Sequence, residues 1–202
     1  MIVSGSLKTI KNMNKTTVRK CYLQKRLDLT RSEYEVWNTK MMGQVAKMDW
    51  GIYKNIHLFL SIAKHNEVDT FSMVNYWRGE YPQLQIIIPR TDFEKNEMEH
   101  VLFDPEQILL KKNKFDIPEP IGGTLFPVEQ IDLVLVPLLA FDKKGHRVGY
   151  GKGFYDRFLA QCRPNTQKIG LSFFDPVDEI ADANDQDVKL NKCICPDKIW
   201  EF

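Results

Sequence analysis

The chain has 202 residues, of which 27% are charged, and its formal net charge is +1. This length is typical of one compact domain with a sizeable core, and the balanced charge excludes the global field that draws a protein to nucleic acid or to an anionic membrane surface. The longest uncharged apolar run, residues 133–141, contains Pro137 and is far shorter than the roughly 20 residues that cross a bilayer. We therefore expect a soluble protein in which any anion site is local.

Four cysteines occur, at positions 21, 162, 193 and 195. Only the last two lie close together, and a CxC pair without a second cluster of Cys or His is a poor zinc site. A chain of this length does not need disulfide staples, which indicates a reduced, cytoplasmic setting. Residues 1–12 contain no signal-peptide core, and we expect them to be a disordered extension before a single domain over residues 13–202.

Two amphipathic helices are predicted at the start of this domain. In the first, Lys15 and Arg19 lie four residues apart, so that both cations project from one side. The segment TRSE at 30–33 fits a capping box and opens the second helix. Apolar residues recur along the second helix at helical spacing, which favours core packing over a cofactor site. These residues are Tyr34, Trp37, Met41, Val45 and Met48.

Strands and helices alternate through the rest of the chain. Strands are predicted at 55–62, 85–89, 131–137 and 168–174, with helices at 71–78 and 154–162. We expect the strand at 85–89 to end at its proline, and the acidic stretch and the FDIPEP segment after it to be irregular. The near-continuous apolar run IDLVLVP suits a strand covered on both faces.

This alternation predicts an α/β fold. Strands separated by helices form a mostly parallel central sheet with helices on both sides, that is, a three-layer α/β/α, Rossmann-like architecture. Ligands of such sheets bind beyond the carboxyl ends of the strands. We therefore look for a site in the segments that follow the predicted strands.

One such segment is RVGYGKGFYDR, residues 147–157, in which three glycines alternate with larger residues just before a predicted helix. Alternating glycines free the backbone to turn its amides inward, and amides at a helix N-terminus bind anions. Arg147, Lys152 and Arg157 add charged donors, which favours a polyphosphate over a lone carboxylate. Aromatic residues in the segment are suited to walling a flat heterocycle.

Two familiar phosphate motifs do not match this segment. A Walker A loop requires glycine five positions before Gly151, where His146 stands, and Ser or Thr at the position of Gly153. A dinucleotide fingerprint fails as well, because the third glycine comes one residue early and a hydrophilic linker precedes the segment. The alternative is a turn that only connects a strand to a helix, but three glycines cost more chain entropy than a connector requires.

Residues 131–157, IDLVLVPLLAFDKKGHRVGYGKGFYDR, resemble the 5-formyltetrahydrofolate cyclo-ligase family, also called 5,10-methenyltetrahydrofolate synthetases. Four further features occur in the family order: Lys15 with Arg19, EVDT at 67–70, IIIPR at 86–90 and IPEP at 117–120. The resemblance extends from about residue 15 to 195. It implies an ATP- and Mg²⁺-dependent closure of 5-formyltetrahydrofolate to 5,10-methenyltetrahydrofolate, in which ATP phosphorylates the formyl oxygen, N10 attacks the activated carbon, and ADP and phosphate are released.

The resemblance also implies roles for individual residues. Lys152 and Arg147 would act on the transferring phosphoryl group, and Glu67 would accept hydrogen bonds from the pterin. The residues implied in ATP binding are Lys15, Arg19, Arg147, Gly149, Tyr150, Gly151, Lys152, Gly153, Phe154 and Tyr155. The apolar walls of the folate site would be Leu60, Phe93, Met98, Phe115 and Tyr155, for which ordinary core packing is the alternative. Asp156 and Asp187 would bind Mg²⁺, with Asp182 and Asp185 competing for the second position.

Two alternatives to a cyclo-ligase follow from the same sequence. The first is a nucleotide- or folate-binding module that has the same fold without turnover. A nucleic-acid binder would need a wider basic surface. The four histidines show no shared spacing, and none is assigned a catalytic task. We expect small-molecule partners only, no nucleic acid or membrane partner, and a monomer.

Overall fold

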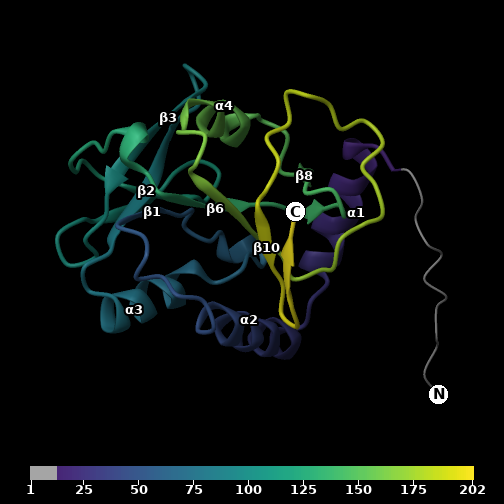
Figure 1. Ribbon diagram of the computed structural model, residues 1–202, viewed down its shortest axis with the longest axis horizontal. Helices are drawn as coiled ribbons and strands as arrows, with labels where there is room; N and C mark the ends of the chain where they lie inside the picture. Colours follow the sequence, from purple (N-terminus) through teal and green to yellow (C-terminus); the bar gives the residue numbers. More distant parts are fainter. Residues whose placement is uncertain (1–12) are drawn as a thin grey trace.

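The computed structural model describes residues 13–202, so the prediction for residues 1–12 falls outside the described residues. Its centre is a seven-stranded sheet with the order β11-β10-β9-β6-β1-β2-β3 (Figure 1). The five inner strands run parallel, and the two outermost strands are antiparallel to their neighbours. The strands of the sheet are β1 (Asn55–His57), β2 (Gln85–Asp92), β3 (Glu97–Leu102), β6 (Leu133–Pro137), β9 (Gln167–Leu171), β10 (Lys192–Ile194) and β11 (Ile199–Glu201).

Four α-helices accompany the sheet: α1 (Lys15–Leu27), α2 (Arg31–Val45), α3 (Thr70–Glu80) and α4 (Phe154–Gln161). Helices α2 and α3 lie on one side of the sheet and α4 on the other (Figure 1). Two-stranded sheets are formed by β4 (Leu110–Lys112) with β5 (Pro118–Pro120), and by β7 (Ala140–Phe141) with β8 (Arg147–Val148). Short 3₁₀ turns are η1 (Ala63–His65) and η2 (Val128–Gln130). The architecture is the predicted α/β/α arrangement.

Strand β6 shows why the sheet needs cover on both sides. Leu133 and Leu135 pack into the core beneath α2 and α3, whereas Val134 and Val136 pack into the core beneath α4. All four side chains are fully buried. Their alternation explains the near-continuous apolar run, because both faces of a central parallel strand must be apolar.

The two N-terminal helices begin where the sequence indicates. The side chain of Asn14 accepts a hydrogen bond from the amide of Thr17 and caps α1. Thr30 and Glu33 form the predicted capping box of α2. The stripe along α2 is core as predicted, because Met41 and Val45 are fully buried and the other members pack against the same cluster.

The predicted strand at 55–62 is largely wrong, because only residues 55–57 are paired as β1. The residues that follow are buried, but they leave the ladder to enter the loop before Glu67. Their apolar character reflects packing rather than strand pairing. Strand β2 continues through Pro89 to Asp92, since β1 ends opposite Ile87 and the proline needs no partner on that side.

Seven strands were not expected from the sequence: β3, β4, β5, β7, β8, β10 and β11. The acidic stretch contains β3, an edge strand, whose exposed glutamates are tolerated because one face is open to solvent. FDIPEP contributes β5, which pairs with β4. At the C-terminus, β10 and β11 have three residues each and are too short for a clear alternation.

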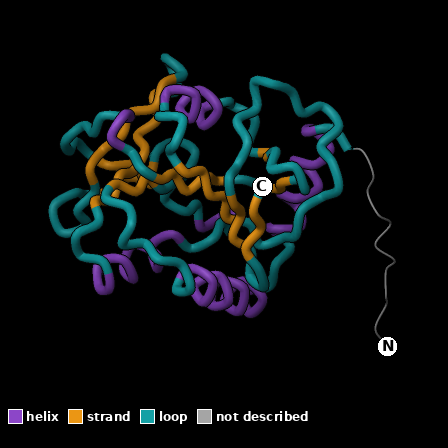
Figure 2. The backbone as a smooth tube through the Cα atoms, in the orientation of Figure 1, coloured by secondary structure: helices purple, strands orange, loops and turns teal. Residues whose placement is uncertain are grey.

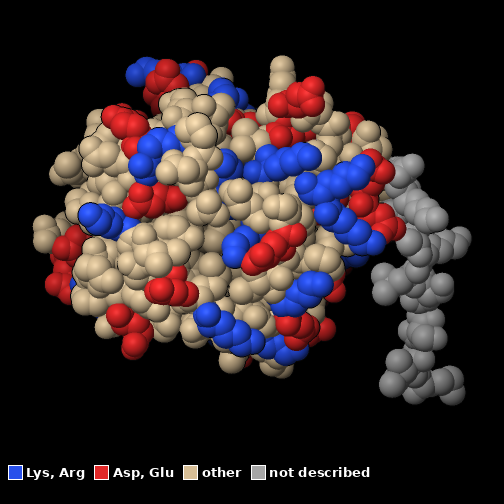
Figure 3. Space-filling model, viewed as in Figure 1, with Lys and Arg blue, Asp and Glu red and all other residues tan. Residues whose placement is uncertain are grey.

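Loops occupy much of the chain between these elements (Figure 2). Acidic and basic side chains are intermixed over most of the face seen in Figure 3, in keeping with the small formal net charge. Among residues 13–202, no helix combines the length and the apolar character of a membrane span. All four cysteines are free, and Cys193 and Cys195 are buried.

Candidate active site

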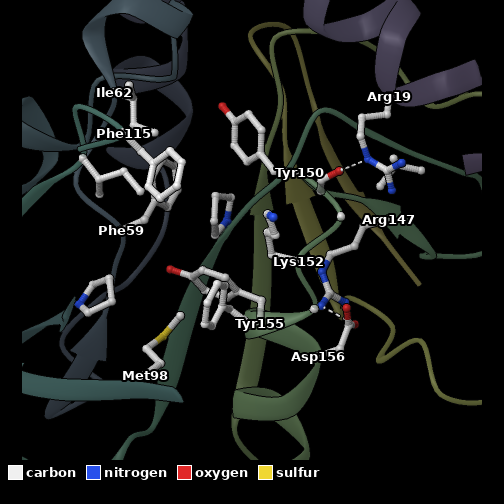
Figure 4. A pocket seen from close by; sticks show the side chains of 18 of the residues that line it. Arg19, Phe59, Ile62, Met98, Phe115, Arg147, Tyr150, Lys152, Tyr155 and Asp156 are labelled. Carbon is white, nitrogen blue, oxygen red and sulfur yellow. Dashed lines mark hydrogen bonds and ion pairs between the residues drawn. The ribbon is translucent and has the colours of Figure 1, made fainter. Parts of the chain in front are cut away.

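A cavity of about 460 Å³ opens beyond the carboxyl ends of β1 and β6. The chain order changes direction here, because β2 lies on one side of β1 and β6 on the other. Ligands of open α/β sheets bind at such a point. Figure 4 shows that the segment after β8 lines one wall, and that the loops after β1 and β4 line the opposite wall.

Cations gather on the wall formed by α1 and the glycine segment. The cavity is lined there by Lys15, Arg19, Arg147 and Lys152. The Nε of Arg19 donates to the carbonyl of Gly149 at 2.9 Å, which joins α1 to the glycine segment. Lys152 is exposed at the tip of the segment. This wall is therefore suited to a polyanion.

The glycine segment turns sharply before α4. Gly151 and Gly153 have φ angles of +90° and +69°, in the left-handed region that side chains other than glycine avoid. A Cβ on Gly151 would lie 3.0 Å from the guanidinium carbon of Arg19. Gly153 is also the N-cap of α4, so the amides that open this helix belong to the cavity wall.

Each of the two predicted metal carboxylates is paired with a predicted phosphate-binding cation. Asp187 accepts from the Nζ of Lys15 at 2.6 Å, and Asp156 accepts from Arg147 at 2.7 Å (Figure 4 shows the second pair). Burial alone would raise the pKa of Asp187, but the hydrogen bond from Lys15 holds that pKa below its ordinary value. Arg147 is itself buried and also donates to the carbonyl of Val188.

The candidates for the second carboxylate are separated by their positions. Asp187 lines the cavity, whereas Asp182 accepts the backbone N–H of Lys15 at 2.6 Å and Asp185 is exposed. No cluster of three or more potential metal ligands occurs among residues 13–202. A pair of carboxylates on one cavity wall fits Mg²⁺, which usually takes one or two carboxylates together with phosphate oxygens and water.

The opposite wall is apolar and aromatic. It contains Leu60, Phe93, Met98 and Phe115, and Tyr155 lies at the boundary between the two walls. The rings of Phe93 and Phe115 are 4.6 Å apart, and Phe93 also contacts Phe154 at 5.4 Å. The two walls together form a cavity that is charged on one side and suited to a flat ring system on the other.

Glu67 lies between these walls and is only 3% exposed. Its carboxylate accepts from the hydroxyl of Tyr150 at 2.6 Å and from the amide of Ile62 at 2.8 Å. Burial raises the pKa of Glu67, and the nearby charge of Arg26 opposes that rise. Tyr150, which the resemblance assigns to ATP, therefore turns its hydroxyl toward the predicted folate carboxylate.

The residues to which the resemblance assigns a role all line this one cavity, apart from the competing metal candidates Asp182 and Asp185. Arg157 does not, because its guanidinium donates to the carbonyls of Lys152 and Asn96 and fastens the glycine segment. Seven further lining residues were missed: Phe59, Ile62, His65, Pro89, Ile117, Pro137 and Val148. Most are apolar and look like core residues in the sequence; their position directly after or within predicted strands was the available signal.

The family model of the 5-formyltetrahydrofolate cyclo-ligase family matches residues 11–196. The chain therefore belongs to this family. It is 28% identical to the 5-formyltetrahydrofolate cyclo-ligase of Mus musculus over 189 residues, which cover 87% of this chain and 90% of the mouse protein. It is also 28% identical to the enzyme of the same name from Escherichia coli strain K12, over 73% of this chain and 80% of that protein.

Two solved structures of the cyclo-ligase family have this fold. The 5,10-methenyltetrahydrofolate synthetase of Aquifex aeolicus superposes with a TM-score of 0.78 at 26% identity, covering 94% of this chain and 93% of that one. The synthetase of Mycoplasma pneumoniae superposes with a TM-score of 0.67 at 27% identity, covering 90% of this chain and 98% of that one. The predicted resemblance and fold are confirmed.

Proposed function

We propose that this protein is a 5-formyltetrahydrofolate cyclo-ligase, which uses ATP to convert 5-formyltetrahydrofolate to 5,10-methenyltetrahydrofolate. The observation that supports this most strongly is the two-sided cavity, in which four cations and a glycine segment face an apolar, aromatic wall. Such a cavity is suited to hold a triphosphate beside a reduced pterin. Membership of the family supplies the reaction class.

The chemistry explains why both ligands must share one cavity. A formamide oxygen is a poor leaving group, so the γ-phosphoryl group of ATP is transferred to it. N10 of the folate then attacks the formyl carbon, and the oxygen departs as phosphate. The protein aligns the two substrates and stabilises the charge that develops on the transferring phosphoryl group.

Four cations are proposed to act on the phosphates. Lys15 and Arg19 project from α1, and Arg147 and Lys152 project from the adjoining segment after β7 on the same wall. We assign Lys152 to the transferring group, since it lies at the exposed tip of the segment, and the buried Arg147 to holding Asp156 in place until nucleotide and metal bind. The amides from Gly149 to Gly153 and the start of α4 would complete the phosphate site.

Asp156 and Asp187 would hold Mg²⁺, which shields phosphate charge when it is bound. In the structure both carboxylates pair with cations of the same wall. Binding of the nucleotide with its Mg²⁺ would let Lys15 and Arg147 turn to phosphate oxygens while the carboxylates turn to the metal. The exchange replaces each ion pair with another, so no charge is left unpaired.

The folate would occupy the apolar side. Glu67 offers carboxylate oxygens to the N–H groups of the pterin, and the rings of Phe93, Phe115 and Tyr155 would pack against the flat parts of the substrate. A cavity of about 460 Å³ is within the usual range for small-molecule sites, which span roughly 300–1,000 Å³.

The test is a reconstitution with purified protein, 5-formyltetrahydrofolate, ATP and Mg²⁺, followed by the absorbance of the methenyl product. Product is expected only when all three are supplied, with one ADP released per product. Tight binding of both ligands without any product would contradict the proposal and favour the binding module that lacks turnover.

A further inference from the structure

We propose that Arg26 is a positioning residue that holds Glu67 and Tyr150 in the arrangement needed to receive the folate. The inference rests on the proposed function and concerns a residue outside the cavity wall. Arg26 is not among the residues that line the cavity, so it would act through the two side chains that it contacts.

Arg26 is an unusual arginine because it lies in the last turn of α1 and is only 6% exposed. Its guanidinium donates to the carbonyl of Leu138 at 3.3 Å and to the hydroxyl of Tyr150. A buried guanidinium is costly to desolvate unless it is paired. Arg26 therefore needs a partner, and one of its two hydrogen-bond partners, Tyr150, lines the cavity.

The partner charge is Glu67. A guanidinium nitrogen of Arg26 lies 3.8 Å from the carboxylate of Glu67, and Arg26 alone forms an ion pair with that carboxylate among the described residues. The hydroxyl of Tyr150 stands between them, accepting from Arg26 and donating to Glu67. The three side chains form a buried relay that connects α1, the loop after β1 and the glycine segment.

The relay fixes both the place and the charge of the carboxylate. The carboxylate of Glu67 accepts hydrogen bonds from the hydroxyl of Tyr150 and from the amide of Ile62. Its backbone carbonyl accepts from the hydroxyl of Tyr34 of α2 at 3.0 Å. Two other titratable groups near it supply no positive charge. Tyr155 is neutral when protonated, and burial raises its pKa. Burial lowers the pKa of His65, so its ring is uncharged at neutral pH. Arg26 therefore supplies the positive charge that opposes the effect of burial on the pKa of Glu67 and favours the ionised carboxylate.

The charge of Glu67 matters for recognition. An ionised carboxylate only accepts hydrogen bonds, whereas a protonated one carries a donor that would face the N–H groups of the pterin. Loss of the Arg26 charge would thus weaken folate binding near neutral pH by protonating Glu67. The weakening would be reversed at higher pH, where Glu67 ionises without help.

The test compares wild-type protein with Arg26→Gln and Arg26→Lys, measuring KM for 5-formyltetrahydrofolate and for ATP between about pH 6 and pH 9. At neutral pH we expect Arg26→Gln to raise the folate KM by at least about tenfold and the ATP KM much less. The folate KM should approach the wild-type value as the pH is raised. Arg26→Lys, which keeps the charge, should follow the wild-type pH profile. Arg31→Gln, the same change at a residue exposed on α2, is the matched control.

The outcomes separate this inference from the proposed function. Wild-type protein that forms no product contradicts the function itself. Wild-type turnover with an Arg26→Gln folate KM that is unchanged, or raised equally at every pH, contradicts the role of Arg26. If Arg26→Gln does not fold, Tyr150→Phe decides: it removes the hydroxyl through which Arg26 reaches Glu67, so it should raise the folate KM more than the ATP KM, and an unchanged folate KM would overturn the proposal.

Discussion

The Nζ of Lys15 lies 2.6 Å from both carboxylate oxygens of Asp187, although the two residues are 172 positions apart in the sequence. This pair lies in the cavity lining predicted to bind phosphate, where Lys15 begins α1 and Asp187 belongs to the loop before β10. A predicted phosphate ligand and a predicted metal ligand thus neutralise each other before substrate arrives. Under the proposed function, nucleotide and metal together would replace both partners, whereas either one alone would leave a charge without a partner.

The first prediction concerns the metal. Asp187→Asn should raise the Mg²⁺ concentration needed for half-maximal activity by at least about tenfold, because the cavity loses one of the two carboxylates predicted to bind the metal. Asp182→Asn is the matched control, since Asp182 accepts only the backbone N–H of Lys15 and an amide oxygen can do the same. Titrations of activity with Mg²⁺ measure both. An Asp182→Asn protein with the larger shift would reverse the assignment.

The second prediction concerns Lys152. Lys152→Ala should lower kcat/KM for ATP by roughly a hundredfold, because a cation beside the transferring phosphoryl group stabilises charge that develops in the transition state. Lys152 is exposed, so the free energy of unfolding should change by less than about 0.5 kcal/mol. Lys20→Ala, an equally exposed change next to Arg19 but outside the cavity lining, should retain activity. Equal losses in the two variants would show that Lys152 has no specific role.

The third prediction uses two glycines. Gly151→Ala should raise the ATP KM by about tenfold or more, because its φ of +90° strains a side chain by about 1–2 kcal/mol and its Cβ would push Arg19 away. Gly43→Ala is the control, since a Cβ there meets no atom within 4 Å. Gly43 lies within α2, so that variant should gain about 0.5–1 kcal/mol of stability and keep its activity. Steady-state kinetics and denaturant unfolding of both proteins check the contrast.

Local patterns predicted the four α-helices and four of the strands, and the structure shows the physical reasons. The capping box at Thr30 and the stripe of α2 depend on nearby residues only, and both are as expected. The glycine segment leads into a helix as predicted, because left-handed glycines and helix N-termini are also local features. The sequence of this segment does not reveal its long-range partners, such as Arg19, which donates a hydrogen bond to the carbonyl of Gly149.

The predictions fail where the local sequence pattern does not determine the structure. The run after β1 is apolar because it enters the core and the cavity, and periodicity does not distinguish that from strand pairing. Strand β3 is hidden by the charges of its open face, and β11 by its three residues. Arg26 looks like any basic residue of a helix, and its burial becomes visible only when Tyr150 and Glu67 are placed against it.

The last prediction concerns acid stability and two histidines behind the cavity. His57 and His100 are buried, their rings are 5.1 Å apart, and both contact Phe158 of α4. Burial lowers the pKa of His100 from 6.5 to about 4, and burial together with His100 lowers that of His57. The folded state therefore favours the neutral rings, whereas the unfolded chain takes up protons below pH 6.5.

Because the unfolded state binds more protons, stability is complete above about pH 6.5 and is lost as the pH falls toward 4. For His100 alone, the free energy of unfolding should drop by about 2 kcal/mol between about pH 7 and pH 5. His100→Phe keeps a ring against Phe158 but cannot titrate, so its drop over the same interval should be smaller by that amount. Urea unfolding of both proteins at the two pH values measures the difference. An equal drop in the two proteins would mean that folding does not lower the pKa of His100, which would contradict the prediction.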